Sequence, residues 1–316
     1  MNKWLKLAVL TLFATLLLVA CSTKPEPTTS EAPVQDDSAY PVAIKDATGK
    51  EISFDKAPEK IITTAPSITE TLFALGLNDE IIGVSDNDTY PKEATEKEKI
   101  GGMTLDAEKI VALAPDVVFI HETSVASSEA ALQQLQDAGV TAFVVPESKN
   151  FDETYQAIEL IGEVVDHEDA AKMIVTTMQD KVKKVADDVK ALDVERSVFI
   201  ETSDAPSIYT AGKGSYVQEM FDLLGATNVA KDGGDNWFEI DPEAIVKGNP
   251  DVIIVQYDYV PDIIEKVKKR DGFSSIEAVK NDRVVQVDVD STSRTGPRLA
   301  DGFEEIAKAI YPEAFQ

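Results

Sequence analysis

LDAEKIVALAPDVVFI (residues 105–120) and IDPEAIVKGNPDVIIV (residues 240–255) are two versions of one segment. The Asp, Glu, Ile, Val, Pro, Asp and Val of the first copy recur in register in the second, without a gap. A weaker repeat supports this one, because ETLFALG (70–76) resembles EMFDLLG (219–225). Copies this far apart favour two related lobes over a solenoid, whose repeats run to roughly 20–50 residues. Two similar lobes imply a cleft between them, where ligands commonly bind.

Short apolar segments alternate with amphipathic ones around both copies. Strands are expected at 60–64, 81–85, 117–121, 141–145, 197–201, 252–256 and 284–287. Helices are expected at 68–75, 106–113, 130–138, 215–224, 244–247 and 302–310. Ser67 and Glu70 have the spacing of a capping box, so the first of these helices should begin at Ile68 and end before Gly76. Strands that alternate with helices predict an α/β fold with parallel sheets covered on both faces.

A longer helix is expected between the two copies. From Glu168 to Leu192, apolar residues recur at spacings of three and four, namely Ala171, Ile174, Met178, Val182, Val185, Val189 and Leu192. This spacing predicts one amphipathic helix. At 1.5 Å per residue it would be a rod roughly 37 Å long. The sequence therefore places one stiff helix between two lobes.

The first residues indicate export and anchoring. Residues 1–20 have a basic start, with Lys3 and Lys6, and an apolar run too short for a membrane span of about 20 residues. The run ends in Leu18-Val19-Ala20-Cys21, which resembles a bacterial lipobox, so Cys21 should carry a lipid; an incidental cysteine in an uncleaved anchor is the alternative. Cys21 is the only cysteine, which excludes an internal disulfide.

The domain organisation follows from these segments. Residues 22–39 are rich in Ser, Thr, Pro, Glu and Asp, as expected for a disordered tether with an end-to-end distance of about 25 Å. We therefore expect a signal peptide (1–20), a lipidated Cys with its tether (21–39), an N-terminal lobe (40–166), a linker helix (167–192) and a C-terminal lobe (193–316). The chain has 30 basic and 57 acidic residues, a formal charge of −27, which argues against nucleic acid or anionic lipid as a partner.

Seven short motifs resemble those of one protein family. They are APSITE (65–70), GVS (83–85), YP (90–91), LDAE (105–108), PDVV (115–118), GKGS (212–215) and SRTGPR (293–298). Together they make the chain, from about Pro41 to Pro312, similar to the substrate-binding proteins of ABC importers for cobalamin and ferric siderophores. The resemblance implies the class III periplasmic-binding-protein fold, with two Rossmann-like lobes joined by one long helix. It also implies capture and delivery without catalysis, at the outer face of a bacterial plasma membrane.

The resemblance also implies partners. They are an ABC permease dimer with its ATPase subunits, and the binding protein itself is expected to be a monomer with no cofactor other than its ligand. In the family, one glutamate on each lobe contacts arginines of the permease, and Glu108 and Glu243 occupy the matching positions. Such paired opposite charges set orientation and encounter rate more than affinity. The alternative is local, because each glutamate follows a capping Asp, where a negative charge suits the helix dipole.

Candidate cleft residues lie on loops that follow strands, where open α/β sheets bind ligands. They are Pro66, Ser67, Asn87, Tyr90, Met103 and His121 in the first lobe, and Tyr209, Trp237, Tyr257, Tyr259, Arg294 and Arg298 in the second. Tyr90 and Trp237 match aromatic positions of the family, and aromatic faces suit a flat macrocycle. Arg294 and Arg298 have two interpretations: they could bind ligand carboxylates bidentately, or they could pair with surface Asp or Glu.

The ligand itself stays open. Cobalamin is favoured, a ferric siderophore comes next, and haem or another large chelate is the third alternative. Cobalamin-binding relatives carry a Trp where this chain has Gly101-Gly102-Met103. His121 could bind cobalt or haem iron, or only donate a hydrogen bond. With two histidines, the chain lacks the His-rich cluster of zinc or manganese importers. It also lacks the Gly-x-Ser-x-Gly elbow of a serine hydrolase. A two-lobed enzyme of glycosyltransferase type is a distant alternative, because an exported chain has no ready supply of a nucleotide donor, and a surface adhesin is another.

Overall fold

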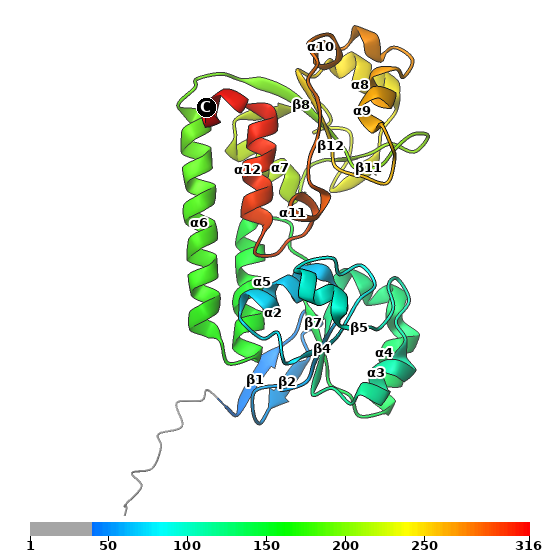
Figure 1. The fold of residues 1–316 in the computed structure, drawn as a ribbon, viewed down its shortest axis with the longest axis vertical. Coiled ribbons are helices and arrows are strands. Elements are labelled where there is room, and N and C mark those ends of the chain that lie inside the picture. Colours follow the sequence, from blue (N-terminus) through cyan, green and yellow to red (C-terminus); the bar gives the residue numbers. More distant parts are fainter. Residues whose placement is uncertain (1–39) are drawn as a thin grey trace, which may run out of the picture. The chain divides into compact units, whose positions relative to one another are not determined.

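Two parallel β-sheets, separated in the chain by one long helix, organise residues 40–316, which are the residues that the computed structural model describes (Figure 1). One sheet precedes the helix and the other follows it, and we refer to these halves as the N-terminal and C-terminal lobes. Within this part of the chain, no helix is long and apolar enough to cross a membrane. The expected signal peptide, Cys21 and the tether lie outside the described residues.

The N-terminal lobe has a five-stranded parallel sheet in the order β5-β4-β3-β6-β7. Its strands are β3 (Ile61–Thr63), β4 (Ile81–Val84), β5 (Glu98–Lys99), β6 (Val117–His121) and β7 (Ala142–Val145). Its helices are α2 (Pro66–Ala74), α3 (Ala107–Leu113), α4 (Glu129–Asp137) and α5 (Phe151–Val164), with 3-10 turns at Lys92–Glu96, Glu122–Ser124 and Ala126–Ser128. The antiparallel hairpin of β1 (Val42–Lys45) and β2 (Glu51–Phe54) precedes this sheet.

The C-terminal lobe has a four-stranded parallel sheet in the order β10-β8-β12-β13. Its strands are β8 (Arg196–Glu201), β10 (Ala226–Asn228), β12 (Val252–Val255) and β13 (Val284–Gln286), and β9 (Tyr209–Ala211) and β11 (Trp237–Glu239) form an antiparallel pair beside them. Its helices are α7 (Tyr216–Leu223), α8 (Pro242–Gly248), α9 (Ile263–Lys268), α10 (Glu277–Lys280), α11 (Val289–Ser293) and α12 (Leu299–Ile310), with 3-10 turns at Phe273–Ser275 and Pro312–Phe315.

Helices cover both faces of each sheet, as predicted. In β6, Val117 and Phe119 belong to the apolar cluster that includes α2 and α5, whereas Val118 and Ile120 belong to the cluster that includes α3 and α4. Because side chains alternate along a strand, these clusters lie on opposite faces. Alternate residues of β12 likewise pack with α7 and α12 on one face and with α8 and α9 on the other.

The sequence repeat corresponds to a structural repeat. The strand order β4-β3-β6-β7 of one lobe matches β10-β8-β12-β13 of the other, and the repeated segments form α3-β6 and α8-β12. Asp116 accepts a hydrogen bond from the backbone N–H of Lys60, just before β3 (3.0 Å). Asp251 accepts the equivalent bond from the N–H of Ser197, at the start of β8 (2.8 Å). The likeness therefore extends from strand order to single hydrogen bonds.

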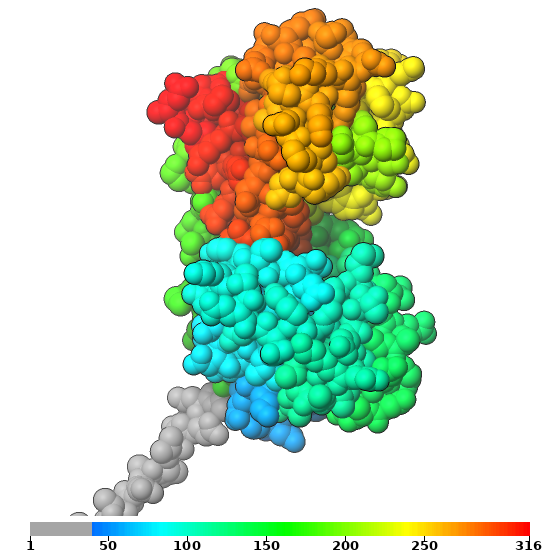
Figure 2. All heavy atoms as spheres, turned by 45° about the vertical axis from the view of Figure 1, so that its right-hand side comes forward, coloured from blue at the N-terminus to red at the C-terminus, as the bar shows by residue number. Residues whose placement is uncertain are grey.

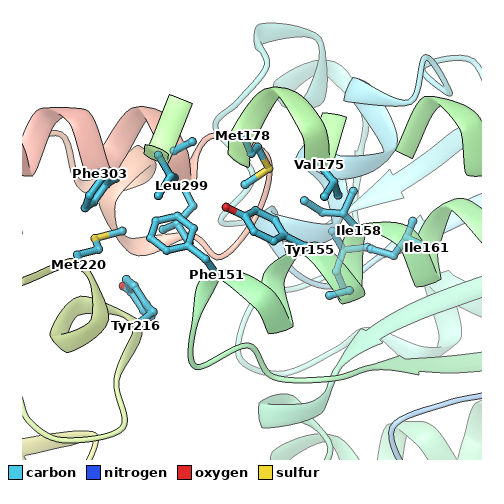
Figure 3. Close-up of a cluster of buried hydrophobic side chains, with 14 of the residues drawn as sticks. Phe151, Tyr155, Ile158, Ile161, Val175, Met178, Tyr216, Met220, Leu299 and Phe303 are labelled. Atoms are coloured by element: carbon cyan, nitrogen blue, oxygen red, sulfur yellow. The ribbon is translucent and has the colours of Figure 1, made fainter. Parts of the chain in front are cut away.

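Helix α6 (Glu168–Lys190) is the single long helix expected between the lobes. It packs on α5 of the N-terminal lobe and on α12 of the C-terminal lobe (Figure 1). Figure 3 shows the apolar cluster at this junction, where Met178 of α6 lies near Tyr155 of α5. In the same cluster the rings of Phe151 and Phe303, from α5 and α12, meet edge-on with centroids 5.6 Å apart. One apolar cluster therefore runs through both lobes.

The start of α2 differs from the prediction. The capping box is wrong, because the helix begins at Pro66 and its cap residue, Ala65, makes no side-chain hydrogen bond. Proline fits this first position, since its φ is already helical and the N–H that it lacks would have no partner there. Ser67 therefore lies inside the first turn. Glu70 is left without a capping role and makes the contacts described below.

Helix α5 was not predicted, although the sequence carries its signals. The side chain of Asn150 caps it by accepting a hydrogen bond from the N–H of Glu153 (2.7 Å). Its buried residues include Phe151, Tyr155 and Ile158, at the spacing of one helical face. The antiparallel pairs β1-β2 and β9-β11 were not predicted either, because the alternation of strands with helices along the chain favoured only parallel strands.

Candidate ligand-binding cleft

A cavity of about 670 Å³ is lined by both lobes. Much of its lining follows β6, β7, β8 and β12, at the carboxyl ends of these parallel strands, which is where open α/β sheets bind ligands. Figure 2 shows the surface hollowed at the right, between the yellow segment of the C-terminal lobe and the green segment of the N-terminal lobe. The lining includes five of the predicted residues, namely His121, Tyr209, Trp237, Tyr257 and Tyr259.

A second cavity of about 440 Å³ adjoins the first, because His121, Ser293 and Thr295 line both. Its other walls come from the start of α2, from the loop after β5 and from the 3-10 turns after β6. It brings together six of the predicted residues, namely Pro66, Ser67, Asn87, Met103, His121 and Arg294. We call the two adjoining cavities the cleft.

The C-terminal side of the cleft is an aromatic wall made of Tyr209, Tyr216, Trp237, Tyr257 and Tyr259. The Tyr216 and Trp237 rings meet edge-on at 5.6 Å, and the Tyr257 and Tyr259 rings lie 5.0 Å apart. Tyr209, Trp237 and Tyr259 are 41%, 40% and 64% exposed, so they offer apolar surface to a ligand. Tyr257 is only 2% exposed and acts as a support.

A buried ion pair holds this wall in place. Arg270 donates hydrogen bonds to both carboxylate oxygens of Glu201 (2.6 and 2.7 Å) and to Asp204 (2.7 Å). The Tyr257 hydroxyl donates to Glu201, and burial together with this bond raises the pKa of Tyr257. The Tyr259 hydroxyl accepts a bond from the N–H of Asp204 (3.0 Å). Two tyrosines of the wall are thus fixed by groups outside the cleft.

His121 lies at the end of β6, where the two cavities meet. Burial lowers the pKa of His121, although the nearby Glu147 and Glu122 act in the opposite direction. Its Nδ1 is 2.8 Å from the hydroxyl of Thr123, which orients the ring. A neutral imidazole can ligate a metal or donate one hydrogen bond. Among residues 40–316, no group of three or more His, Cys, Asp or Glu is placed to hold a metal ion.

The two predicted arginines contact a buried carboxylate of the other lobe. Glu70, whose side chain is 1% exposed, accepts hydrogen bonds from Arg294 (2.7 Å) and twice from Arg298 (2.8 and 2.7 Å). The Arg298 guanidinium lies over the ring of Tyr90, 3.9 Å from its centroid, a cation–π arrangement. Arg294 also donates to Thr89 (2.7 Å). Tyr90 and Arg298 line neither cavity.

The two candidate docking glutamates occupy equivalent places. Glu108 is in the first turn of α3, capped by Asp106, and Glu243 is in the first turn of α8, capped by Asp241. Both glutamates are exposed. Neither side chain has a partner among the residues that the structure describes, so both are available to a second protein.

Several residues of the cleft were not predicted. They are Glu147, Ser148, Lys149, Thr202, Ser203, Gly214, Ser215, Tyr216, Asn236, Gln256, Asp258 and Val289 in the larger cavity, Thr64, Ala65, Gly102, Thr123, Ser124 and Ser127 in the smaller, and Ser293 and Thr295 in both. Many of them follow strands, like the residues that were predicted. Gln256 and Asp258 follow β12 next to the predicted Tyr257 and Tyr259, so position after a strand is the signal that points to them.

Comparison with known proteins agrees with this geometry. The family profile described as "Periplasmic binding protein" matches residues 61–290. A Bacillus subtilis protein named as an uncharacterized ABC transporter substrate-binding lipoprotein is 42% identical over 307 residues, 96% of each chain. A Halobacterium salinarum protein named as a cobalamin-binding protein is 26% identical over 319 residues, 98% of this chain and 85% of that one.

A solved structure gives the same result for the fold. It is a Staphylococcus epidermidis protein described as a possible iron-binding (periplasmic solute-binding) protein, which superimposes with a TM-score of 0.74 at 37% identity. The match covers 81% of this chain and 100% of that chain. Two parallel sheets, one long helix between them and this likeness confirm the predicted fold class.

Proposed function

We propose that this chain, which belongs to the periplasmic binding protein family, captures a large metal chelate and delivers it to a permease. It is an ABC transporter substrate-binding protein, so its role is to bind and present a ligand rather than to transform it. The partners of such a protein are a permease and its ATPase subunits. This membership removes the two-lobed enzyme and the adhesin from consideration.

The cleft is the observation that carries the proposed ligand. Its two cavities, of about 670 and 440 Å³, suit a cargo larger than an amino acid or a simple sugar. Three exposed aromatic side chains line it, and apolar ring faces favour a flat macrocycle. The Halobacterium salinarum relative is named for cobalamin, which is the cargo that we favour. A ferric siderophore or haem is the alternative in the same cleft.

The visible absorption spectrum of the purified protein tests which ligand it binds. The purified chain is incubated with cobalamin, haem or a ferric siderophore, desalted, and its visible spectrum recorded; we expect the corrin spectrum to remain with the protein. Replacing Tyr209 and Trp237 together by Ala should weaken retention at least tenfold, because apolar contact area is lost. Leu223→Ala is the matched control, since Leu223 is 41% exposed but lines neither cavity. If no chelate is retained, the proposed function is wrong.

Delivery is proposed to depend on Glu108 and Glu243. A two-lobed protein on a two-subunit permease needs one charged contact for each half, and these exposed, equivalent glutamates supply it. Reversing both to Lys should abolish uptake in cells while ligand retention by the purified protein is unchanged. Glu51→Lys with Asp180→Lys is the matched control, because these exposed acids lie on β2 and α6. Normal uptake by the Glu108 and Glu243 double variant would contradict the proposal.

Anchoring is proposed to occur through a lipid on Cys21, at the outer face of a bacterial plasma membrane. The lipobox, the tether and the lipoprotein name of the Bacillus subtilis relative support it. Cys21→Ser should move the protein from the membrane fraction to the medium or the periplasm, as an immunoblot of the separated fractions would show. Retention of this variant in the membrane fraction would exclude a lipid on Cys21 as the anchor.

A further inference from the structure

The charged side chains that line the cleft are few, and most of them are engaged. They are Glu147, Lys149, Asp258 and Arg294. Lys149 lies 3.6 Å from Glu147, so these opposite charges offset each other. Arg294 is bonded to Glu70 (2.7 Å) and to Asp290 (2.6 Å), and it also donates to Thr89 (2.7 Å). Within residues 40–316, both basic groups of the lining therefore already have acidic partners.

Asp258 is the exception. It follows β12, between Tyr257 and Tyr259 of the aromatic wall, and it is exposed. Its carboxylate has no hydrogen-bond or ion-pair partner among the described residues. The cleft therefore presents one uncompensated negative charge beside the surface on which a flat ligand would lie.

This distribution of charge disfavours the binding of anionic ligands relative to neutral or cationic ones. An anionic group that enters the cleft loses water and gains no free cation in return, and it approaches the carboxylate of Asp258. Like charges placed together at an interface oppose binding strongly. Amide, hydroxamate or cationic groups carry no such penalty, because they can donate to Asp258 or stay neutral beside it.

We infer that the cargo is a chelate whose periphery is uncharged or cationic, and that Asp258 disfavours chelates with free carboxylates or catecholates. This inference rests on the proposed function and narrows it. Chelates surrounded by amides or neutral hydroxamates fit the cleft. Those surrounded by propionates, citrates or catecholates do not.

Matched ligand pairs test the inference on the full chain in detergent. They are cyanocobalamin and its monocarboxylic acid, haem dimethyl ester and haem, and a ferric trihydroxamate and a ferric tricatecholate; affinities are measured by titration calorimetry. In each pair that binds, we expect the less anionic member to bind roughly tenfold to a hundredfold more tightly. Equal or tighter binding of the more anionic member overturns the inference and leaves the proposed function standing. Binding of none of the six overturns both.

A variant series assigns the effect to one residue. Asp258→Asn should reduce the preference within a pair by at least threefold, and Asp258→Lys should reverse it. Asp262→Asn is the matched control, because Asp262 is an exposed acid of the same loop that lines neither cavity, and it should leave the ratio unchanged. If the ratio is the same in all four proteins, Asp258 is not the discriminating group and the inference is wrong.

Discussion

Glu70 is a carboxylate in a place where a charge is costly unless it is paired. The residue as a whole is 3% exposed, and its two carboxylate oxygens accept hydrogen bonds from Arg294 and Arg298 of the other lobe. The three charges satisfy one another, with Asp290 beside Arg294 as the fourth member of the group (2.6 Å). Arg294 and Arg298, which the sequence offered as ligand groups, therefore help to hold the lobes together, and neither is a free cation for a ligand.

Glu70→Gln should lower the free energy of unfolding by about 3 kcal/mol, because it leaves two partly buried arginines without their carboxylate. Urea denaturation followed by circular dichroism measures this. Glu219→Ala is the comparison: Glu219 accepts one hydrogen bond, from the N–H of Phe151 (2.7 Å), and its loss should cost about 1 kcal/mol. A Glu70 variant within about 0.5 kcal/mol of the wild type would show that the ion-pair group contributes little.

At the scale of elements, the two lobes share one local arrangement of a helix and the strand that follows it. A seven-residue helix, α3 or α8, is capped by an Asp and ends on a residue in the left-handed conformation, Ala114 (φ 49°) or Asn249 (φ 44°). An Asp then accepts hydrogen bonds from backbone N–H groups just before or at the start of the neighbouring strand. The repeated Asp-x-Glu and Pro-Asp motifs are thus a helix start and a strand anchor. The exposed glutamate of each helix is the part that these local contacts leave unused.

The strand anchors should differ in strength. Asp251 accepts bonds from both the N–H (2.8 Å) and the hydroxyl (2.7 Å) of Ser197 and is half-buried, whereas Asp116 accepts from two backbone N–H groups at the exposed surface. We expect Asp251→Ala to lower the free energy of unfolding by about 2 kcal/mol and Asp116→Ala by about 1 kcal/mol. Thermal unfolding of both variants checks the order. The reverse order would mean that burial does not set the strength of these bonds.

At the scale of the whole described unit, the lobes are joined in more places than the chain connection requires. Helix α6 packs on both lobes, and Phe151 of one meets Phe303 of the other. Glu70 and Glu219, which are equivalent in the sequence repeat, each bind the opposite lobe. Hinge motion needs a few residues that are free to turn. A rod and two reciprocal contacts leave little such freedom, so we expect a small closure.

Small-angle scattering with and without bound chelate measures this closure. We expect the radius of gyration to change by less than about 1 Å, because packed elements resist continuous deformation. Arg294→Met with Arg298→Met should increase the change, since it removes one of the interlobe contacts. A compaction of several ångströms in the wild type would contradict the limited closure.

The sequence alone determined the alternation of strands and helices and the long helix between the two repeats, because these depend on periodicity, caps and a repeat that lie within short windows of the chain. It did not determine the shorter helices α9, α10 and α11 or the short strands β5 and β10. Ten of the twelve candidate residues that it indicated line the cleft: seven lie at or near the ends of strands, two at the start of α2 and one, Arg294, just after α11. Only the tertiary structure decided what Arg294 and Arg298 bind, because their partner, Glu70, is 224 and 228 residues away in the chain. Only the tertiary structure showed, for the same reason, that Arg270 supports the aromatic wall through Glu201, 69 residues before it. Pairing of this kind depends on distance in space, which no local pattern encodes.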